Sequence, residues 1–218
     1  VREGDVVKEG QLLVRLDEAV ARANHESSRQ RYLGLRAMQA RLEAEQLGRA
    51  SVRFHADLEA AASDPLIRQQ MLNQEQLFMT RRNLLRSDLQ SIEENIQGQQ
   101  GLLTAYASML THRRSQLALI NEELGNLRGL VKEGYAPRNR QLELERQTAD
   151  ANLAITELLG NTARSQRTVA ELRQKILSRK QEYRKEVEAV LAETGRDVEP
   201  EGKRFSALQG ELARTEIR

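Results

Sequence analysis

The sequence predicts a mainly α-helical chain built around one long antiparallel helical hairpin, in which two helices form a coiled coil. The first indication is composition: 30% of the 218 residues are charged and only 3% are aromatic, which is typical of long helices packed two or three deep. The second is an unbroken apolar repeat between residues 71 and 131. The third is a turn signal, Gly134-Tyr135-Ala136-Pro137, with long helical patterns on both sides of it.

The apolar repeat predicts an outgoing helix over residues 66–133. Its positions recur at alternating intervals of four and three residues, and a helix with 3.6 residues per turn keeps such a repeat on one narrow stripe. At 1.5 Å per residue the helix would be about 100 Å long. We expect the polar members of the stripe to reach solvent rather than to fix the register of the coiled coil. The stripe consists of Met71, Glu75, Phe78, Arg82, Leu85, Leu89, Ile92, Ile96, Gln99, Leu103, Tyr106, Leu110, Arg113, Leu117, Ile120, Leu124, Leu127 and Val131.

The part of the chain before this helix has two different patterns. In residues 1–17, valine, leucine and glycine recur every three residues, which predicts short strands joined by tight turns. Residues 18–65 are expected to form an extra, shorter helix at the base of the hairpin and a segment that returns to the start of the outgoing helix. Asp64 and Pro65 mark that start, with Asp64 as the cap and Pro65 at the first helical position.

The turn at 134–137 predicts that the chain folds back on itself. Gly134 suits the left-handed conformation that ends a helix, whereas Pro137 cannot continue a helix but can begin one. Because the connection is short, the two long helices should be antiparallel neighbours.

The returning helix is predicted over residues 138–212, followed by an extended segment over 213–218. We expect an irregular stretch near 195–203, where Gly195, Pro200 and Gly202 follow one another closely. An interior proline costs a helix about 3 kcal/mol, so a kink or a short loop is predicted there. The apolar seam of this helix should be formed by Val169, Leu172, Ile176, Tyr183, Val187 and Val190.

Composition and spacing also exclude several classes of function. The charges are nearly balanced, with 34 basic and 32 acidic residues interspersed along the chain, which argues against a nucleic-acid partner. There is no cysteine, and His25, His55 and His112 are too far apart in the sequence to form a metal motif. We find no nucleophile–base arrangement and no phosphate-binding loop. The chain is therefore expected to be no enzyme, with no catalytic residue, no metal site and no cofactor.

No run of about 18 apolar residues is present, so no membrane span is expected in this sequence. The pattern begins abruptly at Val1 and ends abruptly at Arg218. We therefore expect the chain to be an excised fragment of a longer protein, from which an anchor could have been removed.

The first seventeen residues resemble the first half of a lipoyl- or biotinyl-type β-barrel. The residues that carry the resemblance are the turn residues and the end of the last strand: Gly4, Asp5, Gly10, Leu16 and Asp17. The second half of such a domain, with its modified lysine, does not follow. A split lipoyl-like half-barrel interrupted by the helical hairpin, and resumed at 213–218, is therefore favoured over a carrier domain.

This order of parts resembles the periplasmic adaptors, or membrane fusion proteins, and most of all those of type I secretion, of the hemolysin-secretion and alkaline-protease-secretion kind. The stretches that carry the resemblance are 1–17, the turn from 131 to 138 followed by 142–146, and 213–218. The resemblance implies a periplasmic protein that links an inner-membrane ABC transporter to an outer-membrane tunnel protein (TolC-like). It also implies self-association, as a hexamer in the full assembly.

Within this family the hairpin tip docks against the tunnel protein. Drug-efflux members carry at the tip an arginine, a leucine four residues later and a serine seven residues beyond; Arg138, Leu142 and Ala149 stand at these positions here. The resemblance thus implies a docking site that contains Gly134, Tyr135, Pro137, Arg138 and Leu142. Tyr135 is either a contact residue or a cover for the helix end. A drug-efflux adaptor and a purely structural coiled-coil scaffold are the alternative interpretations.

Overall fold

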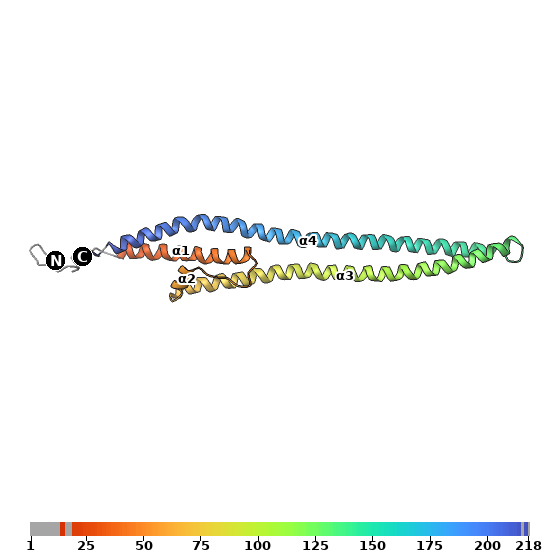
Figure 1. Ribbon diagram of the computed structural model, residues 1–218, viewed down its shortest axis with the longest axis horizontal. Helices are drawn as coiled ribbons and strands as arrows, with labels where there is room; N and C mark the ends of the chain where they lie inside the picture. Colours follow the sequence, from red (N-terminus) through yellow and green to blue (C-terminus); the bar gives the residue numbers. More distant parts are fainter. Residues whose placement is uncertain (1–13, 16–18, 215, 218) are drawn as a thin grey trace, which may run out of the picture. The chain divides into compact units, whose positions relative to one another are not determined.

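The computed structural model describes residues 14–15, 19–214 and 216–217, which are almost entirely helical (Figure 1). The elements in chain order are β1 (Val14–Arg15), α1 (Ala19–Gln46), α2 (Ala56–Ala61), α3 (Pro65–Lys132), α4 (Arg138–Ala213) and β2 (Glu216–Ile217). They form two compact units: unit 1 comprises Val1–Arg86 and Lys180–Arg218, and unit 2 comprises Ser87–Arg179.

The two short strands bring residues 14–15 and 216–217 together within unit 1. β1 pairs with β2 in antiparallel fashion, with Val14 opposite Ile217 and Arg15 opposite Glu216. A split domain requires such a meeting of the two segments. The residues of the proposed half-motif, however, lie outside the described residues, so the lipoyl-like half stays a prediction: Gly4, Asp5, Gly10, Leu16 and Asp17.

Unit 2 is a two-helix hairpin made of the second part of α3 and the first part of α4. The buried Ile92 and Ile96 of α3 pack against Val169 of α4, and Arg179 Nε donates to Asp88 Oδ2 at 3.1 Å. These pairs run in opposite directions along the two helices, as the short turn predicted. On α4 the least exposed positions recur at four- and three-residue intervals: Leu144, Thr148, Ala151, Ile155, Leu158, Thr162, Ser165, Val169, Leu172, Ile176 and Arg179.

Unit 1 adds α1 to the two long helices. One cluster joins Leu33 and Ala37 of α1 to Leu58 of α2 and Ile67 of α3. A second joins Ala40 and Ala44 to Val52 and Phe78. Small alanine side chains allow α1 to approach α3 closely, and Leu58, which is fully buried, anchors a helix of only six residues.

The predicted stripe on α3 is confirmed at Met71 and Phe78 and, apart from Arg113, from Leu85 onward, but it is wrong at Glu75 and Arg82. In unit 1 the side chains of Glu75 and Arg82 are exposed, and those of Gln74 and Arg81 are partly buried in their place. The reason is that α1 also packs against α3 there, so Gln74 and Arg81 contact α1 and become partly buried. Arg82 and Arg113, both on the predicted stripe, do reach solvent.

The interruption predicted near residues 195–203 is also wrong. α4 continues from Arg138 to Ala213 with Pro200 inside it, and its C-terminal part is curved (Figure 1). Packing against α1 holds this stretch helical: Glu201 is buried and accepts a hydrogen bond of 2.8 Å from Ser28 Oγ. Gly202 lies beneath the ring of Tyr32, where an added Cβ would be 3.1 Å from Tyr32 Cε2. Tertiary contacts thus outweigh the local cost of the proline.

Candidate functional site

The hairpin turn is closed by a regular helix-ending motif. α3 ends at Lys132, and Gly134 adopts a φ of 82°, a conformation that glycine reaches without a steric penalty. Gly134 N donates to Val131 O at 3.1 Å, and Tyr135 N donates to Leu130 O at 2.8 Å. This is the Schellman pair of hydrogen bonds, so the last carbonyls of α3 are satisfied within the turn itself.

Tyr135 projects from this turn. It is 80% exposed, and Leu130, which often contacts the residue at this position in such motifs, is itself 47% exposed. Of the two interpretations of Tyr135, a cover for the helix end does not agree with this exposure. The tyrosine is a surface residue at the end of unit 2.

Arg138, Leu142 and Ala149 lie on one side of α4, next to the turn. Residues four and eleven positions apart on a helix point in nearly the same direction, and all three side chains are exposed, Leu142 by 54%. Within residues 19–214 the Arg138 guanidinium forms no hydrogen bond or ion pair. With Tyr135, these residues form an exposed surface that is cationic, apolar and aromatic; we call these four residues the tip face.

Next to the tip face, α3 and α4 contact each other through buried leucines and ion pairs; we call this region the base of the tip face. Leu144 is 1% exposed and Leu124 is 5% exposed, so the apolar seam continues to the end of the hairpin. Arg140 forms an ion pair with Glu123 at 2.6 Å, and Arg128 forms one with Glu145 at 3.2 Å. Both pairs cross from one helix to the other, although exposed pairs of this kind contribute little stability.

The electrostatics of the base follow from these contacts. Hydrogen bonds from Gln141 and Arg128 lower the pKa of Glu145, and hydrogen bonds from Gln147 and Arg146 lower the pKa of Glu143. Both carboxylates are therefore ionised and engaged near neutral pH. The positive charge of Arg138 also lowers the pKa of Glu145, but Arg138 forms no hydrogen bond or ion pair within residues 19–214.

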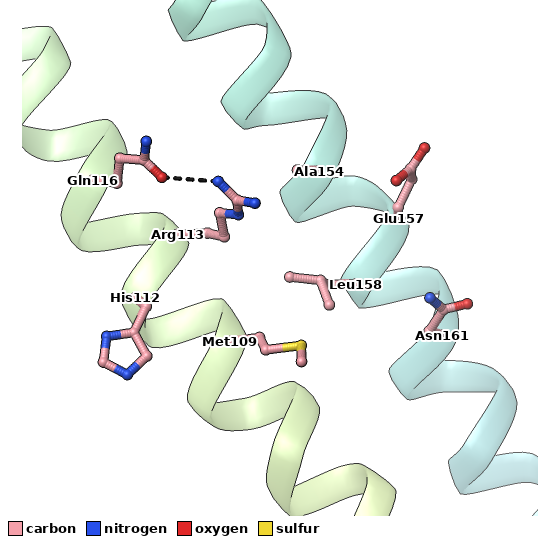
Figure 2. A pocket seen from close by; sticks show the side chains of 8 residues that line it. All are labelled: Met109, His112, Arg113, Gln116, Ala154, Glu157, Leu158 and Asn161. Atoms are coloured by element: carbon pink, nitrogen blue, oxygen red, sulfur yellow. Dashed lines mark hydrogen bonds between the residues drawn. The ribbon is translucent and has the colours of Figure 1, made fainter.

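A hollow of about 450 Å³ lies farther along unit 2, on the seam between α3 and α4 (Figure 2). Arg113, a polar member of the predicted stripe, hydrogen-bonds to Gln116 of its own helix at 2.9 Å. Its side chain extends from α3 toward the small Ala154 of α4 (Figure 2). Met109 and Leu158 point into this gap (Figure 2), which we interpret as a local defect in the coiled-coil seam.

The described part of the chain has no arrangement typical of a catalytic or metal site. Between residues 19 and 214, no three histidine, aspartate or glutamate side chains are grouped so that they could hold a metal ion. None of the helices α1 to α4 combines the length and the apolar character that a bilayer-spanning helix needs.

The structure thus places the predicted site residues in two roles. Gly134 and Pro137 shape the turn, whereas Tyr135, Arg138 and Leu142 are exposed side chains beside it. Sequence reasoning missed the ion pairs that cross between the helices. No signal in the sequence could have revealed the two pairs beside the turn, because each joins residues 17 positions apart on different helices.

Comparisons with known proteins agree on one family. The family model described as AprE, long alpha-helical hairpin, matches residues 21–214. The alkaline protease secretion protein AprE of Pseudomonas aeruginosa is 36% identical over all of this chain, which covers 50% of that protein. The type I secretion system membrane fusion protein PrsE of Rhizobium meliloti is 27% identical over all of this chain, which covers 49% of that protein. The chain thus spans about half the length of these curated relatives.

Two solved structures are similar in fold. The crystal structure of the soluble domain of LipC, a membrane fusion protein of a type I secretion system, superposes with a TM-score of 0.92 at 32% identity, covering 100% of this chain and 82% of that one. The periplasmic adaptor protein EmrA superposes with a TM-score of 0.59 at 14% identity, covering 98% of this chain and 56% of that one. At that identity the second likeness concerns the fold alone.

Proposed function

Because this chain belongs to the AprE long α-helical hairpin family, whose members are membrane fusion proteins of secretion systems and not enzymes, we propose that it is the hairpin part of a type I secretion adaptor. In this role it links an inner-membrane ABC exporter to an outer-membrane tunnel protein in the periplasm. Several copies, a hexamer in the full assembly, stand side by side, and the tip face docks against the tunnel protein.

The observation that carries the docking proposal is the exposure of the tip face. A turn at the end of a coiled coil needs polar side chains for solubility, yet here Tyr135 is 80% and Leu142 is 54% exposed. Arg138 between them has no ion-pair partner among the described residues. Tyrosine and arginine surrounded by apolar contacts are the residue types that dominate the binding energy of protein interfaces.

The rigid base supports the same role. The turn is fixed by its two backbone hydrogen bonds. Leu144, two residues after Leu142, is buried between the helices. A surface held in place before binding loses little conformational freedom when the partner arrives. The tip face is therefore suited to docking against the ends of other helices.

The meeting of β1 and β2 supports the remaining part of the proposal. Antiparallel pairing joins Val14 to Ile217, so a segment before α1 and a segment after α4 lie side by side. We propose that a lipoyl-like domain, begun by residues 1–17 and resumed after residue 213, lies at this end. The chain covers only half of its curated relatives, and the ABC exporter would be contacted through parts beyond the hairpin.

Binding to a purified outer-membrane tunnel protein tests the docking role. Arg138→Asp and Leu142→Asp should each weaken binding by at least about tenfold, since each removes a central contact of the tip face. Arg114→Asp and Leu153→Asp are matched controls, because both side chains are exposed on the same unit away from the turn. Equal binding by all four variants would remove the tip face as the docking site.

A drug-efflux role has less support. Arg138 and Leu142 match the efflux pattern, but Ala149 lacks the hydroxyl that the pattern places there. No observation on the described residues favours efflux over secretion, so we do not propose it.

A further inference from the structure

The two helices of unit 2 carry opposite charge at the same level of the hairpin. In α3, the only charged side chains between residues 87 and 111 are Asp88, Glu93 and Glu94. This stretch of α3, which we call the acidic stretch, faces the segment of α4 around Val169, because Ile92 and Ile96 pack against that valine.

The facing segment of α4, residues 162–179, is predominantly basic. Its single acidic residue is Glu171, and its basic residues are Arg164, Arg167, Arg173, Lys175 and Arg179. We call this segment the basic stretch. Arg164, Arg167, Glu171 and Lys175 follow one another at spacings that place them on one side of the helix, so three cations and one carboxylate share that side.

The hairpin uses little of this charge internally. Arg179 pairs with Asp88 across the two helices at 3.1 Å, and Gln90 donates a hydrogen bond of 2.9 Å to Glu94. The other cations, Arg164, Arg167, Arg173 and Lys175, are exposed and have no ion pair among the described residues. Glu93 is also exposed and forms no ion pair among the described residues. Most of the charge on both stretches therefore points to solvent.

Building on the self-association proposed above, we propose that the basic stretch of one copy docks on the acidic stretch of a second copy. The two copies stand side by side and point in the same direction. Because both stretches lie at one level of the hairpin, charges match only when the copies are level with each other. The stretches thus set the register of the assembly.

The charge pattern also selects the kind of contact. An antiparallel two-fold contact between two α4 helices would bring cations against cations, and one between two α3 helices would bring carboxylates against carboxylates. Contact of α4 with α3 uses two different surfaces of each copy, which is a heterologous contact and can repeat around an axis to close a ring. Like charges brought together at an interface are strongly unfavourable.

A charge-swap experiment tests this contact. Variant A carries Arg164→Glu, Arg167→Glu and Lys175→Glu, and variant B carries Glu93→Lys and Glu94→Lys. Sedimentation equilibrium of the 218-residue chain, at low salt and up to millimolar concentration, measures the association. Each variant alone should associate at least about tenfold more weakly than the unchanged chain. An equal mixture of A and B should recover association, because each reversed surface then meets its complement.

Two controls separate this contact from general charge effects. The variant Lys185→Glu, Arg196→Glu and Arg204→Glu changes net charge as much as variant A, on exposed residues of unit 1, and should associate like the unchanged chain. At about 1 M salt the Debye length is about 3 Å, so charges at the contact are screened. Association of the unchanged chain and of the mixture should then weaken alike.

Cross-linking identifies the contact directly. A carbodiimide joins Lys175 to a carboxylate only when the two touch, and mixing isotopically light and heavy chains distinguishes products formed between copies. Products that join Lys175 of one copy to Glu93 or Glu94 of another are expected. Absence of association at every salt concentration, or a mixture of A and B no better than either alone, would overturn the proposed contact. Binding of the tip face to the tunnel protein is measured separately and does not depend on this result.

Discussion

Arg81 of α3 donates from Nε to Oε2 of Glu45 in α1 at 3.2 Å, and the Glu45 side chain is completely buried. Arg41, one helical turn before Glu45, pairs with its other oxygen. The guanidinium of Arg81 also lies 5.4 Å from the centre of the Tyr183 ring in α4. A single carboxylate near the end of α1 thus links α1, α3 and α4 within unit 1.

Replacing Glu45 by Gln should destabilise unit 1 by about 2 to 3 kcal/mol, because the amide has nearly the same shape but removes the buried negative charge that both Arg41 and Arg81 contact. Urea unfolding followed by circular dichroism measures the change. Glu186→Gln is the matched control, since Glu186 also approaches Arg81, at 3.6 Å, but is 56% exposed. Its effect should stay below about 0.5 kcal/mol, and equal effects of the two variants would contradict the role of Glu45.

Gly202→Ala should lower stability by about 1 kcal/mol, although alanine is the better helix former by a similar amount. The added Cβ would lie 3.1 Å from Tyr32 Cε2. Tyr32 cannot easily move, because its hydroxyl donates to Asp57 at 2.9 Å and its ring stacks on Phe205.

Gly195→Ala is the comparison for that change, since an added Cβ there meets nothing within 4 Å. It should raise stability by up to about 1 kcal/mol. Thermal unfolding of both variants shows whether the two substitutions have opposite signs. Stabilisation by both would mean that the ring of Tyr32 does not restrict residue 202.

Acid should weaken the contact between α1 and α2. Burial of the Asp57 carboxyl favours its neutral form, but hydrogen bonds from Arg36 and Tyr32 outweigh burial and lower its pKa. A lowered pKa in the folded state stabilises the fold fully above the unfolded value of about 3.9, and this stabilisation is lost as the pH falls through the lower folded value.

Stability of the unchanged chain should therefore decline below about pH 4, and Asp57→Asn should reduce that dependence. Urea unfolding at pH 3, 5 and 7 measures it. A hydrogen bond from Arg29 also lowers the pKa of Asp64, so Asp64 contributes to the same loss of stability in acid. The decline should therefore become smaller in Asp57→Asn without disappearing. An unchanged pH dependence in that variant would exclude the contribution of Asp57.

Gly134→Ala should destabilise the turn by about 1 kcal/mol, because a φ of 82° is strained for any residue with a Cβ. Gly129→Ala lies in the last turns of α3, where an added Cβ meets nothing within 4 Å. This substitution should stabilise the helix instead. Hydrogen exchange of residues 128–140 reports local opening of the turn. Equal protection in both variants would show that Gly134 is not needed for its backbone conformation.

Features fixed by local chemistry could be predicted from the sequence. Asp64 accepts a hydrogen bond of 2.9 Å from Leu66 N, and α3 begins at Pro65, as the cap signal indicated. Gly134 takes the left-handed conformation expected of it. The exposure of Arg138 and Leu142 on one side of α4 follows from their spacing and from the heptad phase of the seam.

Features that depend on a third helix could not be predicted. The phase change to Gln74 and Arg81 and the continuity of α4 through Pro200 both arise where α1 packs against the long helices. The buried face of α1 includes small or polar residues such as Ala37, Ala40 and Ser28, which are inconspicuous in a hydrophobic pattern. The partners of buried charges, Glu45 with Arg81 above all, are set by tertiary contacts alone.

The change of spacing along α4 has a consequence for how such hairpins vary in length. Up to Arg179 the inward positions follow a seven-residue repeat; beyond it, Tyr183, Val187 and Val190 begin an eleven-residue one. Deleting seven residues from each arm of unit 2 would shorten it by about 10 Å and leave every remaining layer facing its former neighbour. The same deletion in the unit 1 part of α4 would not match its eleven-residue repeat, so its inward positions would turn away from their former neighbours. Unit 2 can therefore change length in seven-residue steps, whereas the unit 1 part of α4 cannot.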